Sequence, residues 1–182
     1  MTTNLNQHHK TVASQPAKWP AAVRLFHWIS ALLLLLTWIM ITLHENTDGS
    51  YIEWHKSFGV SVLLWMVARV IVRVSSQAPA VMILPAWQKL ISRVIHFGLY
   101  VLLFAMPLSG LLMSWYGGRT IDMFGMVEIP SMLTTDRAKA RFFDDMHTEV
   151  VWPTLLTFTA VHLLAVLKHQ FINKDKVMSR MK

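Results

Sequence analysis

The stretch VRLFHWISALLLLL, residues 23–36, places an arginine and a histidine at the entrance of a long apolar run. A helix that crosses a membrane needs about 20 consecutive, mostly apolar residues, and this run continues to residue 43. An ionisable side chain at such a depth needs a partner, so His27 raises the question of which group it meets. The chain has nine histidines in all, and the others are the first candidates.

The composition favours a membrane protein. Hydrophobic residues make up 54% of the chain and charged residues only 15%, whereas soluble domains average about 25% charged residues. The net charge of +7 is dispersed between apolar runs, which favours membrane orientation and lipid contact over nucleic-acid binding. The chain has no cysteine, which excludes disulfides, iron–sulfur clusters and c-type haem attachment.

Four apolar segments predict an all-α integral membrane protein, a four-helix bundle with spans at residues 23–43, 55–74, 90–115 and 147–171. No small-residue cleavage site follows the first segment, so we predict a retained span. Pro107 and Gly110 predict a bend in the third span, which neighbouring helices tolerate.

Three parts of the chain differ in character. We predict a polar N-terminal tail at residues 1–20, a four-span domain at 21–174 and a short basic C-terminal tail at 175–182. The long loop at residues 116–146 mixes Phe and Met with charges, which fits a short helix lying on the outer surface or a solvated connector equally well.

The distribution of basic residues predicts the orientation. Of the 17 lysines and arginines, 12 lie on the side of the termini and 5 on the other side. By the positive-inside rule both termini are cytoplasmic.

The histidines fall at two depths. His27, His96, His162 and His169 lie toward the cytoplasmic face, and His44, His55 and His147 toward the outer face. His147 and His162 are 15 residues apart on the fourth helix, which is about 22 Å along the axis and about 60° in direction. One helix thus offers an imidazole to the bundle at two levels, where His55 can meet the outer one and His27 the inner one.

Two stacked imidazole pairs are suited to two haems in the bundle core, because haem iron takes one axial ligand from each face. Gly59, one turn after His55, would admit a flat macrocycle. Arg24, like Arg69, Arg73 and Arg93, can pair with haem propionates or serve only as a positive-inside charge. Depth alone also allows His96 or His169 in place of His162 as the inner partner of His27. A second hypothesis for the function is transport of zinc or protons by the same histidines.

The chain resembles the bacterial cytochrome b561 family of four-helix, dihaem membrane cytochromes, from about residue 19 to residue 181. The matching motifs are RLFHW in the first helix, IEWHKSFGVSVLLWMVARVIVR in the second, HFGLYVLLFAMPLSGLLMSW in the third, and MHTEV, HLLAVLKHQFINKD and MSRM in the fourth helix and beyond. The resemblance implies two haem b groups: His27 and His162 ligate the inner iron, and His55 and His147 the outer one. The interval between His147 and His162 is one residue longer than the family pattern, which a bulge near Trp152 and Pro153 would absorb.

The resemblance also implies the activity: electron transfer in the bacterial inner membrane that involves quinone. Some members resemble oxidants of superoxide that pass the electron to ubiquinone, so superoxide:quinone oxidoreductase is the candidate reaction. Related cytochromes are haem-bearing anchor subunits of hydrogenases and formate dehydrogenases, which gives the alternative of a partner subunit. Outer basic residues can steer an anion, although nearby acids (Asp136, Asp144, Asp145) dilute their field; these basic residues are Arg119, Arg137, Lys139 and Arg141.

Overall fold

A computed structural model describes residues 18–47, 49–79, 85–175 and 177–181. Most of the predicted N-terminal tail, with His8 and His9, lies outside the described residues. Four helices are long and apolar enough to cross a membrane: Ala21–Asn46, Ile52–Ser75, Ala86–Tyr116 and Arg137–Ile172. The predicted four spans are thus confirmed, and each helix extends beyond its predicted limits.

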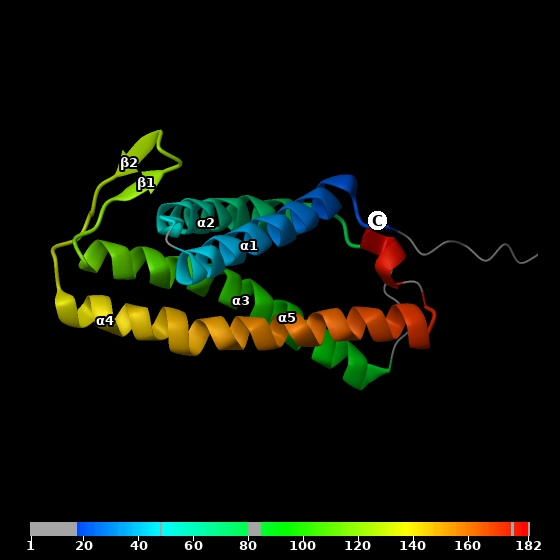
Figure 1. Ribbon diagram of the computed structural model, residues 1–182. Coiled ribbons are helices and arrows are strands. Elements are labelled where there is room, and N and C mark those ends of the chain that lie inside the picture. Colours follow the sequence, from blue (N-terminus) through cyan, green and yellow to red (C-terminus); the bar gives the residue numbers. More distant parts are fainter. Residues whose placement is uncertain (1–17, 48, 80–84, 176, 182) are drawn as a thin grey trace, which may run out of the picture.

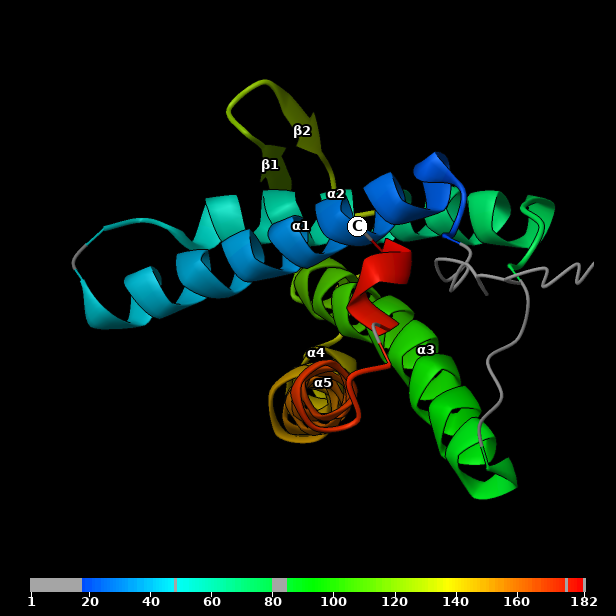
Figure 2. The same ribbon diagram turned by 90° about the vertical axis from the view of Figure 1, so that its right-hand side faces the viewer.

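The first three spans are the α-helices α1 (Ala21–Asn46), α2 (Ile52–Ser75) and α3 (Ala86–Tyr116). The fourth consists of α4 (Arg137–Asp145), the π-helix η1 (Met146–Val151), α5 (Trp152–Leu167) and the π-helix η2 (Lys168–Ile172). α1 and α2 lie side by side, α3 crosses beneath them, and α4 and α5 form one long rod that crosses α3 at an angle (Figure 1, Figure 2).

The bundle has two distinct ends (Figure 1). At the terminal end α1 begins at Ala21 and the fourth span ends at Ile172. At the hairpin end lie the loop between α1 and α2 and a small β-hairpin that connects α3 to α4. The names terminal end and hairpin end are used below for these two levels.

Proline and apolar side chains explain the helices. α1 and α3 begin directly after Pro20 and Pro85, which need no N–H partner at a helix start. Large apolar side chains on the outside of the bundle are strongly exposed, such as Phe97 at 72% and Leu64 at 66%. Such a surface suits lipid contact rather than water.

Small residues let the helices approach each other. The buried core is a compact cluster of Val62 and Met66 from α2, Leu103 from α3 and Leu155 from α5. A Cβ added to Gly98 of α3 would lie 2.2 Å from the ring of Phe158 of α5, so a larger residue there would displace that ring. Buried serines complete the interfaces, as is usual in membranes; these are Ser30, Ser57, Ser109 and Ser114.

A π-turn interrupts the fourth span just before Pro153. Trp152 N–H donates to the carbonyl of His147, five residues back, rather than four as in an α-helix. Pro153 has no N–H, and in an α-helix its ring would crowd the carbonyl of Glu149, so the wider turn relieves that contact. The bulge predicted near Trp152 and Pro153 is confirmed, immediately before Trp152.

The loop after α3 contains a hairpin that the all-α prediction missed. Strands β1 (Ile121–Met123) and β2 (Val127–Ile129) pair antiparallel, with Asp122 opposite Glu128. Phe124 and Gly125 in the turn have positive φ angles of 56° and 72°. The Gly125 N–H donates to the Asp122 carboxylate at 2.9 Å, which closes the turn.

Of the two possibilities left open for this loop, a short helix is present as α4, but it continues the fourth span instead of lying apart on the surface. Asp136 caps it and accepts from the N–H groups of Ala138 and Lys139 at 3.0 and 3.1 Å. These bonds, chiefly the one from Lys139, lower the pKa of the Asp136 carboxyl.

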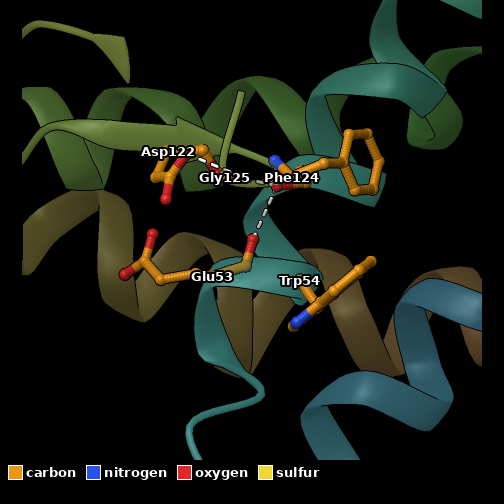
Figure 3. Close-up of a pocket in the computed structure, with 6 residues that line it drawn as sticks. Glu53, Trp54, Asp122, Phe124 and Gly125 are labelled. Atoms are coloured by element: carbon orange, nitrogen blue, oxygen red, sulfur yellow. Dashed lines mark hydrogen bonds between the residues drawn. The ribbon is translucent and has the colours of Figure 1, made fainter. Parts of the chain in front are cut away.

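Ser57 of α2 forms hydrogen bonds with the hairpin. Its fully buried hydroxyl lies 2.8 Å from the carbonyl oxygen of Asp122 and accepts from the N–H of Phe124 at 3.0 Å. Beside it lies a pocket of about 190 Å³, with Glu53 and Asp122 on one side and Trp54 and Phe124 on the other (Figure 3).

Replacing Ser57 with alanine is expected to loosen the hairpin without unfolding the bundle. The change leaves the part-buried N–H of Phe124 and the carbonyl of Asp122 without this partner, which costs about 1–3 kcal/mol. Hydrogen exchange should accelerate at residues 121–129, whereas exchange in α3 should not change. Equal acceleration in both segments would contradict this local role.

The C-terminal segment docks at the terminal end. The 3₁₀-helix η3 (Val177–Met181) follows the fourth span. The indole of Trp28 donates to the carbonyl of Met181 at 2.9 Å, and the N–H of Trp19 donates to that of Arg180 at 3.1 Å. The two ends of the described chain are therefore held together on α1.

Candidate functional site

At the hairpin end, His55 of α2 faces His147 of η1. Their ring centres are 6.3 Å apart and the ring planes are perpendicular, at 90°. Nδ1 of His55 lies 2.9 Å from the carbonyl oxygen of Thr37, and Nδ1 of His147 lies 2.9 Å from that of Met106. A carbonyl can only accept, so each Nδ1 carries the proton, and Nε2 keeps its lone pair free for a metal.

Glycine and serine shape the surroundings of this pair. A Cβ on Gly110 would lie 3.0 Å from Cε1 of His147, so glycine lets that ring approach α3. Ser109 contacts the same ring, with its Oγ 3.1 Å from Nδ1. A Cβ on Gly59 would meet nothing within 4 Å, which leaves open space one turn after His55.

At the terminal end, His27 of α1 faces His162 of α5. Their ring centres are 6.5 Å apart, with 70° between the ring planes. The neighbour of His27 is charged: Nη2 of Arg69 lies 3.0 Å from Nδ1 of His27. The Arg69 guanidinium also lies over the ring of Tyr100, 5.5 Å from its centre.

The geometry of each pair fits the axial ligation of one iron by its two imidazoles. An imidazole nitrogen binds a transition metal at about 2 Å and lies about 1 Å from its ring centre, so two imidazoles that share an iron have centres about 6 Å apart. The two pairs are close to this value. In the described part of the chain, no three or more His, Cys, Asp or Glu residues form a metal-binding group. Each pair offers two imidazoles, the number of protein ligands that bis-histidine haem iron takes.

The π-turn improves the alignment of His147 with His162. Fifteen α-helical residues separate two side chains by about 60° in direction, and one residue absorbed in a π-turn changes this to about 40°. Both side chains then face the inside of the bundle.

The other histidines have different surroundings. His96 is exposed, its Nδ1 lies 2.6 Å from the carbonyl oxygen of Ser92, and its ring centre is 5.3 Å from that of His162. His44 contacts the carbonyl of Gly49 at 3.3 Å, at the hairpin end.

His169 is engaged at the terminal end, where its Nδ1 lies 2.5 Å from Oδ2 of Asp175. Two arginines lie at the same end. Arg24 is half-buried in the first turn of α1, and Arg73 stacks on the ring of Trp19 at 4.2 Å.

Four apolar helices long enough to cross a membrane, with imidazoles from different helices facing each other, define a class: helical-bundle membrane proteins. The profile of the family described as prokaryotic cytochrome b561 matches residues 18–182. The chain belongs to this family, and the resemblance seen in its sequence motifs is confirmed. It is therefore a membrane electron carrier, and its family implies haem b.

Curated relatives support the same assignment. The chain is 35% identical over 177 residues to cytochrome b561 homolog 2 of Escherichia coli K12, covering 91% of this chain and 92% of that one. It is 28% identical over 163 residues to cytochrome b561 homolog 1 of the same strain, with 85% and 91% covered. It is also 26% identical over 165 residues to the probable superoxide oxidase CybB of Yersinia pestis, with 85% and 90% covered.

Sequence reasoning missed the groups that orient the imidazoles. Thr37 and Met106 act through backbone carbonyls, which leave no mark on the sequence. Ser109 and Gly110 carried a signal, as small residues within the third span, but Gly110 was assigned only to a bend. The structure keeps α3 helical through Pro107 and places Gly110 against His147.

Proposed function

We propose that this chain is a dihaem b-type cytochrome. The observation that carries the proposal is the matched pairing of histidines at two levels, His27 with His162 and His55 with His147. Each pair would hold one haem b; Gly59 would leave room beside the hairpin-end pair, and Gly110 would let the His147 ring approach α3. Bound haem iron supplies one-electron transfer with both axial positions filled, which suits electron transfer and not oxygen binding.

The proposed orientation puts the terminal end in the cytoplasm. Most of the basic residues lie at that end, and the positive-inside rule then makes both termini cytoplasmic in a bacterial inner membrane. The hairpin end, with its acidic and aromatic pocket, faces the outer compartment.

The proposed reaction transfers electrons from superoxide to ubiquinone. Two superoxide anions each lose one electron and leave as dioxygen, while one ubiquinone takes up two electrons and two protons. A relative at 26% identity is named a probable superoxide oxidase. Arg119, Arg137 and Arg141 are exposed at the hairpin end, where they would attract an anion, whereas Lys139 pairs with Asp136 at 3.3 Å.

Purified chain alone is expected to contain two haem b per polypeptide and to reduce ubiquinone when superoxide is supplied. A reduced-minus-oxidised visible spectrum with a b-type band, together with a haem and protein assay, measures the first part. Quinol formation that superoxide dismutase abolishes measures the second.

Two outcomes would contradict parts of the proposal. A preparation from haem-replete cells without a b-type band would refute the cytochrome assignment to these histidines. A haem-loaded chain without turnover, which co-purifies with a catalytic subunit, would instead favour an anchor subunit of a hydrogenase- or dehydrogenase-type complex.

A further inference from the structure

The two histidine pairs differ in the groups that face Nδ1. At the hairpin end both Nδ1 atoms face backbone carbonyls, at 2.9 Å each. At the terminal end, Nδ1 of His27 faces the guanidinium of Arg69 at 3.0 Å. A carbonyl accepts the Nδ1 proton, whereas a guanidinium only donates and cannot accept it.

This difference changes how strongly each imidazole donates to iron. A ligand whose N–H is held by a carbonyl becomes more basic, and a more basic ligand stabilises the ferric over the ferrous state. His55 and His147 both have this arrangement. With iron on Nε2, the Nδ1 proton of His27 would face the Arg69 guanidinium, which offers no acceptor, so this ring would be the weaker donor.

The charge of Arg69 also favours the ferrous state of the terminal-end haem. A bis-imidazole iron porphyrin core is positive in the ferric state and neutral in the ferrous state, so a nearby cation disfavours the ferric state. Arg69 is half-buried, between His27 on α1 and Tyr100 on α3. The ion pairs found among the described residues do not include Arg69, so no protein carboxylate there cancels its charge.

We propose that Arg69 is a positioning residue that acts through His27 and raises the reduction potential of the terminal-end haem above that of the hairpin-end haem. This inference rests on the proposed dihaem function. Its consequence is that electron transfer from the hairpin-end haem to the terminal-end haem is favourable, and transfer in the reverse direction is not.

The test is a potentiometric titration of the haem-loaded chain, followed by visible absorbance, for Arg69→Gln, Arg69→Lys and the control Arg73→Gln. Arg73 lies one turn further along α2 and stacks on Trp19. We expect Arg69→Gln to lower the ratio of reduced to oxidised terminal-end haem about tenfold at a fixed ambient potential, about 59 mV for one electron. In Arg69→Lys the reduction potential of the terminal-end haem should stay close to that of the unmodified chain. The reduction potential of the hairpin-end haem should not change in either Arg69 variant.

Assignment of the two potentials uses variants that keep one haem. In His147→Ala only the terminal-end haem should remain, and in His27→Ala only the other. A terminal-end potential equal to or below the hairpin-end potential in these variants would overturn the inference, whether or not Arg69→Gln retains its haem. So would an equal shift of both haems, or a shift in Arg73→Gln as large as that in Arg69→Gln. Absence of haem from the unmodified chain would refute the proposed function itself.

Discussion

Replacing His147 with alanine is expected to halve the haem content of the purified chain and to leave the terminal-end haem in place. The alanine variant of His55 should give the same result. Under the proposed function each change removes one of two axial ligands, and among the described residues no other imidazole ring contacts the one that remains. The measurement is haem per polypeptide, with the visible spectrum of the haem that remains.

The bundle itself should survive these changes, because its core lies elsewhere, around Met66 and Leu103. A matched control is His44→Ala, at the same end, where Nδ1 of His44 lies 3.3 Å from the carbonyl oxygen of Gly49. Full haem content in the control and half in the two variants is the expected pattern. Loss of both haems in His55→Ala, or full content in His147→Ala, would show that this pair does not hold a haem of its own.

The second large effect concerns the terminal end, where His162 competes with His96. Replacing His162 with alanine should remove the terminal-end haem, whereas His96→Ala should retain it. His162 is half-buried and 6.5 Å from His27 between ring centres, and His96 is exposed on α3 with its Nδ1 held by the carbonyl of Ser92.

The same haem assay measures this pair of variants. The ring centres of His96 and His162 are only 5.3 Å apart, so the His96 variant controls for a general disturbance of the packing at this place. Loss of haem in His96→Ala with full content in His162→Ala would reverse the pairing. His27→Ala should behave as His162→Ala does, because it removes the opposite ligand.

The four spans were predictable because length and hydropathy carry most of the information about membrane helices. The ends of the helices were less predictable. The fourth span begins with the charged helix α4 at Arg137, ten residues before the predicted start at residue 147. The hairpin gave almost no signal, since its turn is Phe124–Gly125 and the common hairpin turns carry Asn-Gly or Asp-Gly.

The histidines were predictable as a set, because depth along four helices groups them into two levels. Their hydrogen bonds were not. The carbonyls of Thr37 and Met106, and the approach of Arg69 to His27, depend on how neighbouring helices rotate against each other. Sequence spacing within one helix does not define that rotation.

The π-turn at Met146–Val151 has a consequence for comparing related chains. It accommodates one additional residue without rotating the rest of α5, so an insertion here leaves His162 in register with α1. Correct alignments of this family should therefore open a one-residue gap just ahead of Pro153. Homologues that lack both that residue and the proline should continue as ordinary α-helix through this position.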